Sequence, residues 1–328
     1  MVGLGSIGRR HLANLRALRP EAELWALRRT GGDRPDPGVK VVRAMDEALA
    51  LEPAFAVVAS PAPFHVADAM ALAVAGVHLL VEKPIAHALE GVRDLIDLCR
   101  AHSLVLMTGY SLRFSPALKA MREALDRGRI GRVLGFRAEV GQYLPDWRPG
   151  TDYRQGVTAR AELGGGAVLE LSHEFDYLRL LLGEAEEVCA WTATRGDLDL
   201  DVEDWAEALI RFQDGVLGSV HLDLLQRAPV RSCRIVGSEG TLVWDGLADT
   251  ASLFRPSPGW TELAAGGADR NQLYLDELAH FLDCVRTGAA PAVTGEDGLR
   301  ALELALAVKA SARDGRTVTL PWRNPCEP

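Results

Sequence analysis

The opening turn of the chain constrains its fold more than any other feature. It reads Gly3-Leu4-Gly5-Ser6-Ile7-Gly8, a G-x-G-x-x-G motif, and the segment Ile7 to Leu18 after it has the apolar spacing of an amphipathic helix. In a strand–turn–helix setting, the first glycine permits a tight turn, the second allows a pyrophosphate to approach, and the third lets helix and strand pack. The amides at the helix N-terminus, from Ser6 to Gly8, then face the phosphate charge. The motif therefore predicts a dinucleotide site.

The strand before this turn is unusually short, because only Met1 and Val2 precede the glycines. A central parallel strand usually has about five residues. We therefore expect that residues are missing from the start of this sequence.

The first third of the chain alternates short apolar runs with helical patterns, which is typical of a parallel sheet flanked by helices. Continuous apolar runs are expected for strands that are buried on both faces. The predicted strands are Glu23 to Leu27, Phe55 to Ala59, Val77 to Val81 and Leu104 to Thr108. This part of the α/β chain is predicted to be a doubly wound Rossmann domain, residues 1–114.

A different pattern follows, with a helix over Pro116 to Arg127 and a strand over Val133 to Val140. Alternating segments with turns between them then predict a mostly antiparallel sheet. These segments are Val188 to Thr194, Trp205 to Phe212, Val216 to Leu224, Arg231 to Val236 and Thr241 to Trp244. Helices are predicted over Leu273 to Arg286 and Gly298 to Ala312. We expect residues 115–328 to form a second α/β domain with an open sheet, which suits a chain of 328 residues.

Composition narrows the class of protein. Hydrophobic residues make up 48% and charged residues 25%, as in ordinary globular chains, and the net charge of -9 argues against nucleic-acid binding. The five cysteines are scattered and odd in number, which favours a reducing cytoplasm over a disulfide framework. No apolar run is long enough for a transmembrane helix, and the N-terminus does not resemble a signal peptide.

The residues at the end of the second predicted strand bear on the choice of dinucleotide. An acidic residue there usually binds the ribose of NAD, but this chain has Arg28 and Arg29. Two guanidinium groups favour the 2'-phosphate of NADP, so we expect NAD(P) binding with a slight preference for NADP. The alternative is a solvated arginine pair with no ligand.

Two more segments follow predicted strands: Ser60-Pro61-Ala62-Pro63-Phe64-His65 and Val81-Glu82-Lys83-Pro84. With the glycine motif, they resemble the Gfo/Idh/MocA family of oxidoreductases, whose hallmark is Glu-Lys-Pro at this position. The resemblance continues through residues 109–114, 164–166 and 238–241. It implies a Rossmann domain followed by an α/β domain whose open sheet often mediates homo-oligomers, here a dimer or tetramer. Residues expected to bind the cofactor include Ser60, Pro61, His65, Glu82 and Lys83.

Lys83 is the leading catalytic candidate. It follows a parallel strand at the carboxyl end, where open α/β sheets bind ligands. Pro84 disfavours helical torsions at Lys83, which would fix the direction of the side chain. A lysine beside a nicotinamide cation and a substrate hydroxyl can exchange a proton as hydride moves, and the family assigns its matching lysine that role. The alternative is a surface lysine at a strand end.

The second domain contributes further catalytic candidates. Glu170, His173 and Asp176 are spaced three apart and would share one face of a single helix. In the family, a carboxylate four residues before the histidine helps to polarise the sugar hydroxyl. This chain departs from that pattern with Glu170 at spacing three, or has Glu174 in place of the histidine. A metal half-site and a purely structural histidine are alternatives, and we expect no metal.

Substrate contacts are expected from Tyr110 and Arg113 and from the loop that contains Tyr143, Trp147 and Arg148. Aromatic faces suit sugar rings, and a guanidinium suits a phosphate or carboxylate. A packing loop anchored by its aromatic residues is the alternative. The resemblance implies hydride transfer between NAD(P) and a secondary alcohol or ketone of a sugar derivative, possibly a nucleotide-linked one. NAD-assisted glycoside cleavage and a cofactor-binding regulator without chemistry are the other hypotheses.

Overall fold

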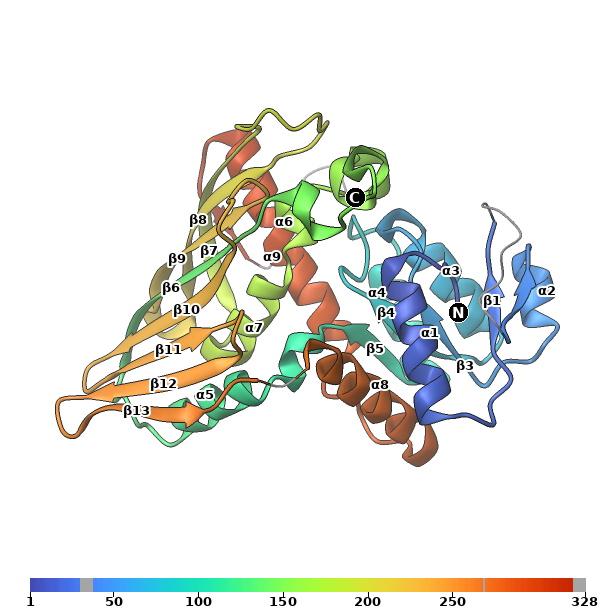
Figure 1. Ribbon diagram of the computed structural model, residues 1–328, viewed down its shortest axis with the longest axis horizontal. Coiled ribbons are helices and arrows are strands. Elements are labelled where there is room, and N and C mark those ends of the chain that lie inside the picture. The colour runs from blue at the N-terminus through green and yellow to red at the C-terminus, as the bar shows by residue number, and fades with distance from the viewer. Residues whose placement is uncertain (30–37, 268, 321–328) are drawn as a thin grey trace. The chain divides into compact units, whose positions relative to one another are not determined.

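The computed structural model describes residues 1–29, 38–267 and 269–320 (Figure 1). The chain forms two compact units. The first consists of Met1–Ser111 together with Asp269–Leu299, and the rest of the described chain forms the second. The segment 269–299 therefore clusters with residues 1–111.

A parallel sheet forms the centre of the first unit. Its strands are β1 (Trp25–Leu27), β2 (Lys40–Val42), β3 (Phe55–Val58), β4 (His78–Glu82) and β5 (Leu106–Gly109). Val2 forms parallel bridges to Leu27 on one side and Val58 on the other, so it joins β2-β1 to β3-β4-β5. The strand before the glycine turn is therefore a single bridging residue. Residues 79–81 are fully buried, as expected of a central parallel strand covered on both faces.

The α-helices that lie wholly within the described part of this unit are α1 (Ser6–Leu18), α2 (Met45–Leu49), α3 (Ala62–Val74), α4 (Val92–Ala101) and α8 (Arg270–Thr287). Helix α1 buries Leu12 and Leu15, and α8 packs against it although 250 residues separate them in the chain. Asn271 of α8 donates to Asn14 of α1 at 2.9 Å, which joins the two helices by a polar contact.

One nine-stranded sheet forms the second unit, in the order β13-β12-β11-β10-β6-β9-β8-β7-β14. All neighbouring pairs are antiparallel except β6 and β9, which are parallel. The strands are β6 (Val133–Gly141), β7 (Ala185–Ala193), β8 (Trp205–Phe212), β9 (Leu217–Asp223), β10 (Val230–Gly237), β11 (Thr241–Asp245), β12 (Thr250–Arg255), β13 (Gly259–Ala264) and β14 (Val318–Thr319). The predicted mostly antiparallel sheet is confirmed.

Helices cover one face of this sheet. Figure 1 shows α5 (Pro116–Asp126), α6 (Ala167–Glu170) and α7 (His173–Leu182) on the same side, with the C-terminal part of α9 (Gly295–Asp314) beside them. Strand β8 alternates strictly between buried residues such as Ile210 and Phe212 and exposed residues such as Leu209, so its buried side faces these helices.

The strands and helices predicted by periodicity are present, with ends that differ by at most three residues. Strands β2, β12, β13 and β14 were not predicted, and helices α2, α3 and α4 were expected between strands without stated bounds. The predicted single helix after Gly166 is divided, because Leu171 leaves helical torsions with ψ at 25°. Among the described residues, no helix combines the length and apolarity needed to cross a bilayer. Four described cysteines are free thiols, and Cys326 lies outside the described residues.

Candidate active site

The glycine turn has the shape that the motif predicts. Gly3 has φ of 85°, and a Cβ there would lie 2.7 Å from the carbonyl oxygen of Ala59. A Cβ on Gly8 would lie 2.4 Å from the carbonyl oxygen of Gly3, so this position needs a glycine for helix and turn to pack. A Cβ on Gly5 would meet nothing within 4 Å. The backbone at the second glycine is therefore approachable, as a phosphate group requires.

Helix α1 starts directly after Gly5, and no side chain caps it. Ser6 and Ile7 lie in its first turn, where backbone amides have no partner within the helix. The first turn of a helix carries partial positive charge. This combination of open backbone and donor amides suits a pyrophosphate.

Arg29, which follows β1, is held by a buried aspartate. Its guanidinium donates two hydrogen bonds to Asp68 of α3, at 2.5 and 3.2 Å, and Ser60 donates to the same carboxylate at 2.8 Å. The hydrogen bond to Asp68 raises the pKa of Arg29. Arg28 lies beside it, and its carbonyl oxygen accepts from Arg43. Asp68 therefore offsets part of the positive charge predicted at the end of β1. The next residue in the chain, Thr30, lies outside the described residues.

His65 links the two loops that follow β3 and β4. Its Nε2 lies 2.6 Å from the carbonyl oxygen of Ser60, and its Nδ1 lies 3.0 Å from that of Pro84. The imidazole is buried, and burial lowers its pKa. Pro61 precedes α3 as its N-cap residue. The geometry makes His65 a brace between these loops.

Lys83 comes directly after β4 and is half-buried. Its peptide bond to Pro84 is cis. Val58 of β3 pairs in parallel with Val81 of β4, so Ser60 and Lys83 leave the sheet at the same edge. The glycine turn leaves this edge too, because Val2 bridges to Val58. The glycine turn and Lys83 thus both lie at the carboxyl ends of the strands of one parallel sheet.

Glu82 is buried and contacts His11 of α1, whose Nε2 lies 2.5 Å from Oε1 of the carboxylate. The backbone amide of Lys83 donates to Oε2 of the same group at 3.1 Å. Burial alone would raise the pKa of Glu82, but the hydrogen bond from His11 and the charges of His11 and Lys83 lower it. Glu82 is thus an ionised group that binds the backbone amide of Lys83.

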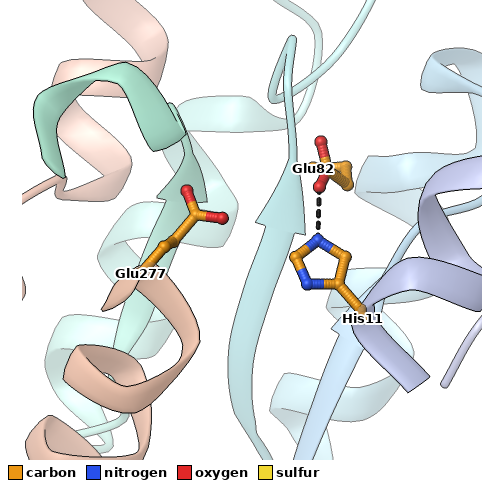
Figure 2. Close-up of side chains that lie close together, drawn as sticks. All are labelled: His11, Glu82 and Glu277. Atoms are coloured by element: carbon orange, nitrogen blue, oxygen red, sulfur yellow. Dashed lines mark hydrogen bonds and ion pairs between the residues drawn. The ribbon is translucent and has the colours of Figure 1, made fainter. Parts of the chain in front are cut away.

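Glu277 of α8 completes a buried cluster with His11 and Glu82, as Figure 2 shows. One nitrogen or oxygen from each residue lies within 4.8 Å of the others. Two atoms that bind one zinc ion at ordinary bond lengths lie about 3 Å apart or more. The 2.5 Å contact between His11 and Glu82 is shorter, so it is a hydrogen bond.

The candidates of the second unit lie on two short helices. Glu170 ends α6 and His173 begins α7, so the turn at residues 171–172 separates them, and both side chains are half-buried. The expectation that one continuous helix aligns them is therefore wrong. Glu203 receives a hydrogen bond from the amide of Val168 at the start of α6 and an ion pair from Lys309, which fixes this helix.

Asp176 and Arg113 bind each other. The guanidinium donates to the carboxylate at 2.7 to 3.1 Å, and both groups are almost fully buried. Two residues earlier on α7, Glu174 makes a similar bidentate pair with Arg231 of β10. Breaking a buried pair of this kind costs about 3–5 kcal/mol. These contacts hold α7 in place, and the charges of Asp176 and Arg113 are used in binding each other.

The remaining predicted substrate residues differ in exposure. Tyr110, after β5, is fully buried, whereas Arg148 is exposed. Tyr143 lies under the guanidinium of Arg227, 3.5 Å from its ring centroid, and Trp147 donates to the carbonyl oxygen of Gln142 at 3.1 Å. The aromatic residues of this loop are therefore anchored, and Arg148 remains at the surface.

Among the buried polar residues that the sequence did not predict, three contact predicted site residues: His11, Asp68 and Glu277. His11 and Asp68 each stand on the apolar side of a helix, next to Leu12 and Ala69 respectively. A polar residue on a buried helix face requires a partner, and this signal is readable in the sequence. The identity of the partner is not, because it comes from a distant element.

Comparisons with known proteins agree with this geometry. Residues 1–110 match the model of the oxidoreductase family with an NAD-binding Rossmann fold, and residues 118–243 match the GFO/IDH/MocA C-terminal domain. The chain is 32% identical to 1,5-anhydro-D-fructose reductase of Ensifer adhaerens, over 78% of this chain and 76% of the relative. It is 30% identical to myo-inositol 2-dehydrogenase of Thermotoga maritima, over 98% and 97%.

A solved structure of levoglucosan dehydrogenase in complex with NADH has the same fold. Its TM-score is 0.86 at 21% identity, and the match covers 98% of both chains. Two family models together cover most of the chain, and the relatives with at least 30% identity extend over most of its length. The glycine turn and the Glu-Lys-Pro segment occupy the carboxyl edge of the parallel sheet. The chain therefore belongs to the GFO/IDH/MocA family and is an oxidoreductase of the sugar and polyol dehydrogenase type, with an NAD-binding Rossmann domain.

Proposed function

We propose that this oxidoreductase transfers hydride reversibly between a nicotinamide dinucleotide and a secondary alcohol or ketone of a sugar or polyol, with Lys83 exchanging the hydroxyl proton. The observation that carries the proposal is that the glycine turn and Lys83 leave the same edge of one parallel sheet. In open α/β sheets, ligands bind at this edge.

The residues at this edge suit a dinucleotide. The open backbone at Gly5 and the uncapped first turn of α1 would hold the pyrophosphate, and Ser60 and Pro61 would line the same edge. When bound, the nicotinamide supplies the hydride chemistry. Lys83 then accepts a proton from the substrate hydroxyl in oxidation and returns it in reduction.

His173 is the second group to which we assign a catalytic role, with Glu170 as its carboxylate partner. The support is the family resemblance together with the half-buried position of both side chains at adjoining helix ends. A neutral imidazole can accept a hydrogen bond from a hydroxyl and so polarise it. Arg148, exposed beside the anchored aromatic residues, is the proposed contact for a phosphate or carboxylate on the substrate, which favours nucleotide-linked or acidic sugars.

We also propose a modest preference for NADP over NAD. It rests on Arg28 and Arg29, which follow β1, and on Arg43, which follows the neighbouring strand β2; Asp68 binds Arg29. The three residues directly after β1 are Arg28, Arg29 and Thr30, so no carboxylate stands at that strand end to repel a 2'-phosphate.

Replacing Lys83 by Met tests the reaction. We expect kcat to fall by about 10³-fold, because general acid–base catalysis contributes a factor of this size. Reduced-cofactor consumption should be measured with 1,5-anhydro-D-fructose, keto-inositols and keto forms of free and nucleotide-linked sugars. Cofactor affinity, measured by NADH and NADPH fluorescence, should change little. Lys119→Met, at an exposed lysine of α5, is the matched control.

Full turnover by Lys83→Met would contradict the proposal. A reaction that cleaves a glycoside without net change in cofactor would favour NAD-assisted cleavage instead, because that route regenerates its cofactor in each cycle. The two results are separated by measuring product and reduced cofactor in the same sample.

A further inference from the structure

Glu82, the last residue of β4, is a carboxylate whose oxygens are directed toward the protein. The residue is only 6% exposed. Its Oε1 lies 2.5 Å from Nε2 of His11 on α1, and its Oε2 accepts from the backbone amide of Lys83 at 3.1 Å. One carboxylate therefore joins helix α1 to the peptide of the leading catalytic candidate.

His11 is fixed in an orientation that serves Glu82. A carboxylate can only accept hydrogen bonds, so the N–H of His11 that meets it is on Nε2. The imidazole is fully buried, and its Nδ1 has no hydrogen-bond partner among the residues that the structure describes. The ring packs edge-on against Tyr274 of α8, with 6.1 Å between the ring centroids. The donor that meets Glu82 is therefore held in place by packing on α1 and α8.

The carboxylate of Glu82 is also enclosed by other elements. Gly109 is its partner on β5, and a Cβ there would lie 3.2 Å from Cδ and Oε2 of Glu82. Glu277 reaches toward it from α8, and one oxygen of that residue lies within 4.8 Å of the contacting atoms of His11 and Glu82 (Figure 2). The carboxylate has little room to turn, so Oε2 stays on the amide of Lys83.

The peptide of Lys83 is contacted on its other side as well. The carbonyl oxygen of Pro84, the next residue, lies 3.0 Å from Nδ1 of the buried His65. Backbone torsions decide which rotamers a side chain can adopt, so fixing this peptide limits the directions that the Lys83 side chain can take. A displacement of about 1 Å at a reacting group can cost about 10²-fold in rate.

We propose that Glu82, oriented by His11, positions Lys83 for proton exchange by holding its backbone amide. The inference rests on the proposed function, in which Lys83 exchanges the proton of the substrate hydroxyl. Glu82 and His11 are then positioning residues, which act through the Lys83 peptide and need not touch substrate or cofactor. This role differs from the cofactor contact that the family resemblance implies for Glu82, and substitution distinguishes the two.

The hydrogen bond to the Lys83 amide can be followed directly, because the chain has four lysines: Lys40, Lys83, Lys119 and Lys309. In protein made with isotope-labelled lysine, the amide signal of Lys83 is identified by its loss in Lys83→Met. Glu82→Met removes both acceptor oxygens. We expect it to speed hydrogen exchange of the Lys83 amide by about tenfold, the factor for one lost hydrogen bond. The other three lysine amides should exchange as in the wild type.

Turnover and cofactor affinity separate the two roles of Glu82. In Glu82→Met, we expect kcat with the sugar substrates to fall by about 10- to 100-fold, because the catalytic amine is displaced. Affinity for NADH and NADPH should stay within about twofold of the wild type. Glu82→Gln keeps an oxygen that can accept from the Lys83 amide, so it should recover most of kcat and the slow exchange of that amide.

Substitutions at His11 test the second step. His11→Leu removes the donor to Glu82, so amide exchange at Lys83 and kcat should change in the same directions as in Glu82→Met. His11→Gln restores a donor and should recover both, and this pair carries the test if Glu82→Met does not fold. Asn14→Leu is the matched control, because it breaks another buried contact between α1 and α8, the pair with Asn271, and should change neither quantity.

Several results would overturn the inference. They are unchanged exchange of the Lys83 amide in both Glu82→Met and His11→Leu, an equal rise in all four lysine amides, which indicates general loosening, and wild-type kcat in Glu82→Met. A loss of cofactor affinity with kcat intact would assign Glu82 to cofactor binding instead. The proposed function fails separately, if Lys83→Met retains full turnover while amide exchange responds as expected, because exchange is measured without substrate.

Discussion

At the end of β1, one buried carboxylate gives two neighbouring arginines different roles. Arg29 is adjacent to Arg28 in the chain, but its guanidinium is bound to Asp68 by two hydrogen bonds. Asp68 is only 2% exposed, so its charge is fully committed to this pair and to Ser60. Arg28 interacts with Arg43 through its own backbone carbonyl, which adds no negative charge. Arg28 is therefore the residue on which discrimination by charge is expected to depend.

Replacing Arg28 by Gln should weaken NADP binding by about tenfold, because a charge-assisted hydrogen bond to phosphate is lost. NAD has no 2'-phosphate, so its affinity should stay within about twofold. Fluorescence titration with NADPH and NADH measures both. Arg19→Gln, at the C-terminal end of α1, controls for the change in net charge. Equal losses for the two dinucleotides would show that Arg28 does not discriminate between them.

At the scale of elements, His65 links α3 to the turns that follow β3 and β4. Both ring nitrogens lie against backbone carbonyl oxygens, of Ser60 and of Pro84. A neutral imidazole has one N–H, so only one of these contacts carries a hydrogen. Burial nevertheless lowers the pKa of His65, because the charged form loses its hydration. His65, which braces these two turns, is therefore neutral at pH 7.

A neutral buried histidine makes stability depend on pH with a definite sign. Its folded-state pKa lies below the ordinary value of about 6.5, so the unfolded chain binds more protons as the pH falls. Stability from this group is complete above that value and is lost as the pH falls toward the folded-state pKa. Between pH 7.5 and 5.5, the wild type should lose about 1 kcal/mol more than His65→Gln. Urea unfolding at both pH values measures this, with exposed His102→Gln as control; identical slopes in all three proteins would contradict it.

Elements were predictable from the sequence to the extent that local pattern determines them. The apolar run at residues 77–81 predicted β4, and the glycine turn predicted the start of α1. Strand β2 was missed because Lys40 to Val42 is too short to show a period, and β12 and β13 were missed because their exposed aromatic residues obscure the alternation. The turn at Leu171 depends on how α6 and α7 pack, and no local signal marks it.

The candidate site divides in the same way. The glycines and Lys83 follow strand ends, so their common edge was predictable from topology alone. The pairing of Asp176 with Arg113 was not, because 63 residues separate the two. Periodicity gives the side of a helix on which a residue lies, and it does not give the residue that meets it from another element.

At the scale of the whole molecule, the uncovered face of the nine-stranded sheet is the feature that the fold leaves unexplained. Alternation along β8 places Leu209 outward, opposite Cys189 of β7 and Ser219 of β9. Large apolar side chains continue across the described part of this sheet, and each is at least 38% exposed: Trp191, Leu209, Leu217, Phe254 and Trp260. Contiguous exposed apolar patches mark sites of association. We therefore propose that this face joins copies of the chain into a dimer or tetramer.

Introducing a charge at the centre of this face should disrupt the assembly. A stable interface buries about 800 Å² on each partner, and a charge at its centre must be desolvated without a partner. We expect Leu209→Glu to elute and sediment as a monomer at concentrations where the wild type is oligomeric. Val74→Glu, at an exposed apolar position of α3 in the first unit, adds the same charge and should leave the mass unchanged. Sedimentation equilibrium over a range of concentrations decides the matter. An unchanged mass for Leu209→Glu would show that the apolar face does not hold the copies together, and a loss of mass in both variants would point to net charge as the cause.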